Sequence, residues 1–301
     1  MRILLFGADG QVGYHLRQTL PEIGELISCN RHQVDLCNLD LLKQSIRDTS
    51  PDFIVNAAAY TAVDHAEDDI GLAYKINADA VELMALEAKK LNSWLIHYST
   101  DYVFDGKTNT PNLESSRPNP INVYGWTKLQ GENAVIASDC KHLIFRTSWV
   151  YSERKSNFAK TILKLATEKD ELKIVSDQIG VPTSAEFIAQ ITADCLAQIN
   201  KQSQAPNNYS GLYHLSPTGR ISWYDFACFL VEEAQKLNFS LTLKKSKIFP
   251  ISSSEYPTLA RRPHFSLLNN TKIQETFDLK IPDWKHHAQK LVSELKQKEI
   301  A

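Results

Sequence analysis

The sequence predicts an α/β protein with a doubly wound parallel sheet and a smaller, discontinuous second lobe. In the first half of the chain, short apolar runs alternate with longer helical patterns. Continuous apolar runs of this length are typical of strands that are buried on both faces of a parallel sheet. In addition, the first run leads directly into a turn with three evenly spaced glycines, which opens a helix.

The elements of the first half follow from these patterns. The expected strands are Ile3–Phe6, Glu25–Ser28, Phe53–Asn56, Trp94–Tyr98 and Leu143–Arg146. The expected helices are Val12–Leu20, Leu39–Asp48, Ile70–Leu91 and Val123–Ala137. Right-handed crossovers between parallel strands then give a Rossmann-like arrangement. A short additional strand is expected to end near Asp35 and Leu36.

After Trp149 the pattern is less regular, which indicates a second lobe. We expect helices at Ser156–Ala166, Glu186–Ile199, Trp223–Leu237 and Trp284–Lys298. One strand is expected at Leu172–Val175. The expected division is a dinucleotide-binding domain of residues 1–149 plus about 180–215, and a substrate-binding lobe of about 150–179 plus 216–301.

Composition narrows the class of protein. The net charge of −2 and the scattered basic residues argue against nucleic acid or a membrane surface as a partner. The five cysteines show no C-x-x-C spacing, which argues against a zinc site and suits free thiols in a reducing compartment. The first apolar run is too short for a signal peptide, and no stretch reaches membrane-spanning length. We therefore expect a cytoplasmic protein.

The glycine turn predicts a dinucleotide site. Gly7, Gly10 and Gly13 are spaced G-x-x-G-x-x-G, with Gln11 and Val12 at the start of the helix. Glycines let a pyrophosphate approach the backbone, and the helix N-terminus supplies N–H donors. Glycines are also needed for any tight turn, so the strand before and the helix after carry the inference.

Two further segments point to the cofactor. The second strand is followed by Arg31 and no carboxylate, which favours NADPH over NADH, with a solvated surface arginine as the alternative. Asp35, next to Leu36, either accepts a hydrogen bond from adenine or caps the next helix. After the third strand, Ala58, Ala59, Tyr60 and Thr61 leave room for a flat ligand, although close helix–strand packing also selects alanine.

The strongest signal for chemistry is Tyr124 and Lys128, which lie on one face of a predicted helix at i, i+4. A nearby ammonium favours the phenolate and is expected to lower the tyrosine pKa. Such a tyrosine donates a proton to a carbonyl oxygen as hydride reaches the carbon. Thr100, at the end of a strand, adds a hydroxyl for the same oxygen.

On these residues the chain resembles the extended short-chain dehydrogenase/reductases. Within them it is similar to the branch that reduces the C4 ketone of dTDP-4-dehydro-L-rhamnose with NAD(P)H, for cell-surface polysaccharide such as O-antigen. The blocks that carry the resemblance are GADGQVG (7–13), VNAAAYTAVDHAE (55–67), HYSTDYVFDG (97–106), NVYGWTKLQGE (122–132), HLIFRTSWVY (142–151), SDQIGVPT (176–183), GLYHL (211–215) and ARRP (260–263).

The resemblance implies roles for individual residues. Thr100, Tyr124 and Lys128 match the catalytic set. The implied cofactor contacts are Gly10, Gln11, Val12, Asp35, Leu36, Ala58, Ala59, Tyr60, Thr61, Tyr124 and Lys128. The implied contacts to the sugar nucleotide are Val63, Thr100, Asp101, Tyr102 and Trp149. A core tryptophan at the junction of the lobes is the alternative for Trp149.

One departure from the family concerns a metal. Some members carry a glutamate two residues past the third glycine, which helps to hold a magnesium ion that bridges a homodimer. Here that position is His15. Magnesium prefers oxygen ligands, so His15 argues against this metal site and this mode of dimerisation. Glu186 is either a remaining ligand or a solvated helix residue.

Three alternatives share the fold. A dehydratase is disfavoured because Tyr102 follows Asp101 where dehydratases commonly carry a glutamate. A sugar-nucleotide epimerase is disfavoured by the Asn30-Arg31 end of the second strand, because epimerases usually carry an acidic residue there. A non-catalytic subunit, like the relatives that regulate methionine adenosyltransferase, does not require Thr100, Tyr124 and Lys128 together.

Overall fold

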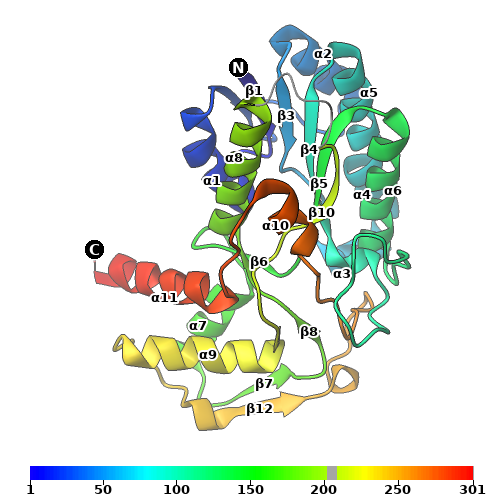
Figure 1. Ribbon diagram of the computed structural model, residues 1–301. Coiled ribbons are helices and arrows are strands. Elements are labelled where there is room, and N and C mark those ends of the chain that lie inside the picture. Colours follow the sequence, from blue (N-terminus) through cyan, green and yellow to red (C-terminus); the bar gives the residue numbers. More distant parts are fainter. Residues whose placement is uncertain (202–208, 301) are drawn as a thin grey trace.

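The computed structural model describes residues 1–201 and 209–300 (Figure 1). Its centre is a six-stranded sheet in which every neighbouring pair is parallel. In spatial order the strands are β10 (Gly211–His214), β5 (Lys141–Thr147), β4 (Trp94–Thr100), β3 (Phe53–Asn56), β1 (Arg2–Phe6) and β2 (Glu25–Cys29). The predicted doubly wound fold is confirmed.

Helices cover both faces of this sheet, because the strands are apolar on both sides (Figure 1). One face packs against α1 (Gln11–Thr19), α8 (Ala185–Lys201) and α10 (Thr271–Phe277). The other face packs against α2 (Leu39–Thr49), α5 (Ala80–Leu91) and α6 (Val123–Ser138). The chain order reverses at β1, which lies between β2 and β3, and ligands bind at such a switch point in open α/β sheets.

The prediction of a short strand that ends near Asp35 and Leu36 is wrong. This segment forms turns, and β2 is the edge of the sheet. The Asp35 carboxylate accepts a hydrogen bond from the Cys37 backbone N–H at 2.9 Å, so a local side-chain contact replaces strand pairing. The opposite edge is β10, which sequence patterning did not predict as a strand.

The single helix expected over Ile70–Leu91 is interrupted. A short helix α3 (Val63–Asp68) precedes α4 (Ile70–Tyr74), a π-helical turn η2 (Lys75–Asp79) and then α5. Within the π turn, the Asn77 side chain accepts from the Tyr60 N–H at 2.9 Å and donates to the Tyr60 carbonyl at 3.1 Å. It also donates to the Thr127 hydroxyl at 3.1 Å. The π turn therefore ties the segment after β3 to helix α6.

A second group of elements packs around its own apolar core below the sheet in Figure 1. Its helices are α7 (Phe158–Glu168), α9 (Trp223–Lys236) and α11 (Trp284–Ile300). Its strands pair as β7 (Leu172–Val175) with β12 (Ile248–Ile251), β8 (Ile179–Gly180) with β11 (Ile221–Ser222), and β6 (Val150–Tyr151) with β9 (Thr183–Ser184). The strand predicted at Leu172–Val175 is confirmed.

Short 3₁₀ turns complete the fold: η1 (Leu20–Glu22), η3 (Asp101–Val103), η4 (Lys245–Lys247) and η5 (Ser253–Glu255). Within residues 1–201 and 209–300, no helix is both long enough and apolar enough to span a membrane.

Candidate active site

A cavity of about 700 Å³ opens at the carboxyl ends of β1, β3, β4 and β5. It brings together nearly all of the residues predicted from the sequence. These are Gly7, Gly10, Gln11, Val12, Arg31, Asp35, Leu36, Ala58, Ala59, Thr61, Val63, Thr100, Asp101, Tyr102, Tyr124, Lys128 and Trp149. Gly13 and Tyr60 do not line it.

The glycine turn forms one end of the cavity. Gly7 has φ +78°, and a Cβ there would lie 2.6 Å from the Ala58 nitrogen, so only glycine fits. Helix α1 begins at the cavity without a side-chain cap on its first N–H groups. Uncapped N–H donors at a helix start suit a phosphate group. Gly13 serves packing instead, because a Cβ there would meet the Gly7 carbonyl oxygen at 2.0 Å.

The segment after β2 lies at the rim of the same cavity. The Arg31 guanidinium is largely exposed and lies 3.6 Å from the Asp35 carboxylate. The hydrogen bond from the Cys37 N–H lowers the pKa of Asp35. Asp35 therefore stabilises its own turn, while Arg31 remains accessible to a charged ligand.

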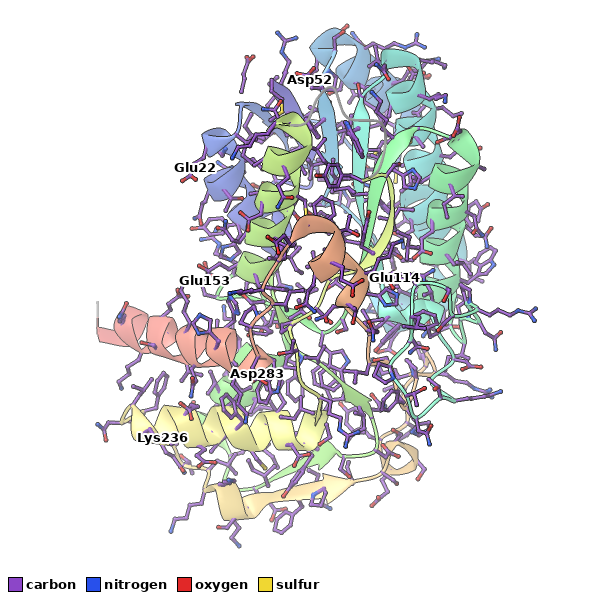
Figure 2. All side chains as sticks on the ribbon, viewed as in Figure 1. Glu22, Asp52, Glu114, Glu153, Lys236 and Asp283 are labelled. Carbon is purple, nitrogen blue, oxygen red and sulfur yellow. The ribbon has the colours of Figure 1, made fainter. Side chains whose placement is uncertain are left out.

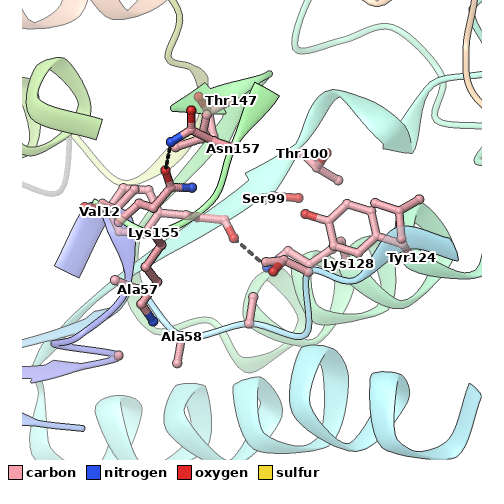
Figure 3. A pocket seen from close by; sticks show the side chains of 18 of the residues that line it. Val12, Ala57, Ala58, Ser99, Thr100, Tyr124, Lys128, Thr147, Lys155 and Asn157 are labelled. Carbon is pink, nitrogen blue, oxygen red and sulfur yellow. Dashed lines mark hydrogen bonds between the residues drawn. The ribbon is translucent and has the colours of Figure 1, made fainter. Parts of the chain in front are cut away.

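Tyr124, Lys128 and Thr100 meet in the middle of the cavity. Figure 3 shows the Tyr124 hydroxyl directed toward Ser99 and Thr100, with Val12 and Lys155 across the space. Asn122 caps α6 by accepting from the Gly125 N–H at 2.7 Å, which fixes the first turn of the helix that carries Tyr124. The Thr100 hydroxyl accepts from the Tyr102 N–H and donates to the Asp101 carboxylate, both at 3.1 Å.

The expected lowering of the Tyr124 pKa is wrong for this geometry. Burial raises the pKa of Tyr124 to about 12, although a hydrogen bond with Thr100 opposes the rise. The Lys128 ammonium donates to the Tyr98 carbonyl at 2.6 Å. Burial lowers the pKa of Lys128 to about 8. Burial also raises the pKa of Asp101 to about 7, and one of its carboxylate oxygens has no hydrogen-bond partner.

A buried ion pair lies beneath these residues. Arg146 of β5 donates to the Glu132 carboxylate of α6 from Nε at 2.9 Å and from Nη2 at 2.6 Å. The Ser99 hydroxyl of β4 donates to the same carboxylate. Strand β4, strand β5 and helix α6 are therefore joined one helical turn from Lys128.

Aromatic rings form the wall of the cavity toward the second core. Trp149 has φ +44°, a conformation that is rare for a bulky residue and costs energy. Its ring stacks on Trp223 with centroids 3.5 Å apart, and Phe158 packs against Trp223. A Cβ at Gly180 would lie 2.7 Å from the Trp149 ring. Trp149 is therefore a cavity residue, and its strain is held by packing.

Sequence reasoning missed a loop and several neighbours. Lys155, Ser156 and Asn157 line the cavity, and Gln11 accepts from the Ser152 hydroxyl and the Asn157 amide at 3.0 Å each. Asn157 caps α7, so the helix begins at Phe158 and not at Ser156. An asparagine before an amphipathic run was the available signal. Other lining residues not predicted are Asp9, Val34, Ala57, Ile76, Tyr98, Ser99, Thr147, Ser148, Val150, Tyr151, Phe158, Trp223 and Phe226.

The residues at the expected magnesium position do not fit that ion. The imidazole of His15 on α1 lies 3.1 Å from the carboxylate of Glu153, which is labelled in Figure 2. Glu186 forms an ion pair with Lys290, which also lies 3.8 Å from Glu294. An ammonium therefore occupies the space beside these carboxylates. In the described part of the chain, no group of three or more His, Cys, Asp or Glu side chains is arranged to hold a metal.

Known proteins are similar to this chain over nearly its whole length. A family model described as the RmlD substrate binding domain matches residues 1–297. The dTDP-4-dehydrorhamnose reductase of Escherichia coli (strain K12) is 47% identical over 300 residues, which are 98% of each chain. The chain belongs to the dTDP-4-dehydrorhamnose reductase family.

Solved structures of dTDP-4-dehydrorhamnose reductases agree with this assignment. The one from Clostridium acetobutylicum ATCC 824 matches with a TM-score of 0.88 at 34% identity, over 98% of this chain and 100% of that one. The one from Bacillus anthracis str. Ames, in complex with NADP, matches with a TM-score of 0.86 at 33% identity, over 97% and 99%. The resemblance stated from sequence is confirmed.

Proposed function

We propose that this protein reduces the C4 ketone of dTDP-4-dehydro-L-rhamnose with NADPH or NADH. The observation that carries the proposal is the meeting of Tyr124, Lys128 and Thr100 in a cavity that also contains the glycine turn. Family membership supports the substrate, because the relatives compared above are reductases of this sugar nucleotide by name.

The cavity fits a dinucleotide at its glycine end. Gly7 leaves no room for a Cβ, and α1 starts with uncapped N–H donors that suit a pyrophosphate. Ala57, Ala58 and Val12 provide small apolar surfaces next to the catalytic set (Figure 3). When bound, a reduced nicotinamide supplies the hydride. We assign Lys128 to the nicotinamide ribose and Arg31 to the adenosine end.

The chain's own residues supply the proton and the geometry. Tyr124 donates its hydroxyl proton to the oxygen that was the ketone, and Thr100 orients that oxygen. The ammonium of Lys128 stabilises the phenolate that remains, because an opposite charge nearby favours the charged form. Asp101, Tyr102 and Val63 border the space for the sugar, and the Trp149–Trp223 stack forms its apolar wall.

We also propose how the chain divides between the two tasks. Residues 1–149 and about 180–215 form the cofactor domain, of which residues 202–208 lie outside the described part. The packing of Ile273 and Phe277 of α10 on the sheet core supports adding that helix to the cofactor domain. Residues 150–179 and most of 216–301 then form the sugar-nucleotide lobe around the second core.

The test is turnover of the keto sugar. Purified protein is mixed with NADPH or NADH and dTDP-4-dehydro-L-rhamnose made by the preceding enzymes, and the nicotinamide absorbance is followed. Wild-type protein should oxidise the cofactor, and Tyr124→Phe should lose at least about 100-fold in turnover while still binding NADPH. Near-normal turnover by Tyr124→Phe would remove the assignment of the proton donor.

Cofactor preference has its own test, because Arg31 is a positively charged side chain at the end that we assign to adenosine. Arg31→Ala should raise KM for NADPH by about tenfold, since loss of one charge-assisted contact costs on the order of 1.5 kcal/mol or more. KM for NADH should change little. Equal effects on both cofactors would show that Arg31 does not recognise the 2′-phosphate.

A further inference from the structure

Two buried side chains that the proposed mechanism does not use lie directly behind Lys128. His97 of β4 is fully buried, and its Nε2 lies 3.3 Å from the Lys128 ammonium nitrogen. Asn56 of β3 is also buried, and its Nδ2 lies 3.3 Å from Nδ1 of His97. Asn56 and His97 are paired across neighbouring strands, so the sheet register sets this contact.

The hydrogen bonds of Asn56 decide which of its atoms faces the imidazole. Its Oδ1 accepts the Ala58 N–H at 3.1 Å, in the turn that lines the cavity. Its Nδ2, which can only donate, is therefore the atom next to His97. The ring nitrogen Nδ1 of His97 must then accept, which places the ring proton of the neutral imidazole on Nε2.

This tautomer acts on the charge of Lys128. With a proton on Nε2, His97 donates toward the nitrogen of Lys128, and a neutral amine accepts that hydrogen bond through its lone pair. An ammonium cannot accept, so protonation of Lys128 sets two donors against each other. The other tautomer only moves the conflict to Nδ1, where it meets the N–H of Asn56. One donor–donor contact persists whenever Lys128 carries its third proton.

We propose that Asn56 and His97 are positioning residues that hold Lys128 and bias it toward its neutral amine. The inference rests on the proposed function, in which the charge of Lys128 controls how readily Tyr124 gives up its proton. The backbone also takes part, because the Tyr98 carbonyl accepts from Lys128 in either charge state. Burial of His97 keeps its own pKa well below the usual value, so the ring stays neutral.

The other titratable groups around Lys128 do not replace this bias. Glu132 lies one turn along α6 and favours the ammonium, but it is paired with Arg146 of β5. Tyr124 lies one turn back on α6, and Asp101 borders the cavity beyond it. His97 is therefore the polar side chain from the sheet that meets the amine directly.

The first experiment needs no substrate and is made on wild-type protein. Nitrogen-15 NMR of histidine-labelled wild-type protein at about pH 9 reports which ring nitrogen of His97 carries the proton. We expect protonated Nε2 and unprotonated Nδ1, with His97→Gln used to assign the signal. A protonated Nδ1 would overturn the proposal.

The second experiment measures the basic limb of the kcat/KM profile against pH. In His97→Gln, rotation of the amide presents its oxygen to Lys128, so an acceptor replaces a donor and the ammonium is favoured. The basic limb should move up by about one pH unit, while KM for NADPH stays within about threefold. His214→Gln is the matched control, because His214 is another buried histidine of the same sheet. Its imidazole contacts the Asn269 carbonyl.

The outcomes separate this proposal from the proposed function. A basic limb that His97→Gln leaves unmoved, or that both variants move equally, would overturn the positioning role while turnover of the keto sugar stands. Absence of turnover in wild-type protein would remove the proposed function, and the NMR result would still decide the tautomer of His97.

Discussion

Removal of the Glu132 carboxylate should strongly destabilise the protein, since it leaves a charge buried without its partner. The side chains of Arg146 and Glu132 are only 3% and 1% exposed, and two hydrogen bonds join them. In Glu132→Gln one amide oxygen remains for the guanidinium, while the amide NH₂ faces another donor. Breaking one side of a buried ion pair costs about 3–5 kcal/mol.

Thermal unfolding converts this cost into a measurable shift. At about 2–4 °C per kcal/mol for a chain of this size, the melting temperature of Glu132→Gln should fall by about 6–20 °C. Glu232→Gln is the matched control, because Glu232 pairs with Lys245 and both side chains are about half exposed. An exposed pair contributes about 0–1 kcal/mol, so the control should shift by no more than a few degrees.

A double variant separates the lost charge pair from general disruption. In Glu132→Leu with Arg146→Met, both charges are replaced by apolar groups, and such replacement of a buried pair is often neutral or stabilising. Its melting temperature should therefore lie well above that of Glu132→Gln. If Glu132→Gln melts within the range of the Glu232→Gln control, the pair does not stabilise the fold and the reasoning from burial is wrong.

Three further predictions concern the cavity and its surroundings. Gly7→Ala should weaken NADPH binding measured by calorimetry, because Gly7 has φ +78° and no room for a Cβ. The same variant should lower the free energy of unfolding in urea by at least about 1–3 kcal/mol, and an unchanged urea midpoint would contradict this. The folded-state pKa of Asp101, raised to about 7 from an ordinary value of 3.8, makes folding less favourable as pH rises between these values. The free energy of unfolding of Asp101→Asn, measured by chemical denaturation, should therefore rise relative to that of wild type from pH 4 to pH 8. A difference between the two proteins that does not change with pH would refute the raised pKa of Asp101. Treatment with EDTA should leave the melting temperature unchanged, because His15 pairs with Glu153 and Glu186 with Lys290; a drop that magnesium restores would show a metal site.

Local signals predicted the parts of the site that depend on neighbours in sequence. The glycine turn and the i, i+4 pair of Tyr124 and Lys128 need only a strand, a turn and a helix in order. The prediction of a strand near Asp35 failed because the hydrogen bond that the Asp35 carboxylate accepts from the Cys37 N–H competes with sheet pairing. Apolar patterning does not detect that competition.

Long-range contacts could not be predicted from the sequence for a different reason. The pairing of Glu132 with Arg146, and of Asn56 with His97, joins segments whose neighbourhood depends on sheet register. In the sequence each is an ordinary polar residue in or beside an apolar run. The sequence pattern also does not predict the π turn at Lys75–Asp79, since the helical pattern continues on both sides of it.

Helix α6 shows why the site needs these hidden contacts. Tyr124, Lys128 and Glu132 follow each other at i, i+4 and i+8, so one face of the helix directs a phenol, an amine and a carboxylate toward the sheet. Burial of such a face is unfavourable unless each group is paired. The Tyr98 carbonyl with His97 meets Lys128, and Arg146 with Ser99 meets Glu132. Two of the three side chains are therefore held by β4 and β5, and Tyr124, at the other end of the row, lines the cavity.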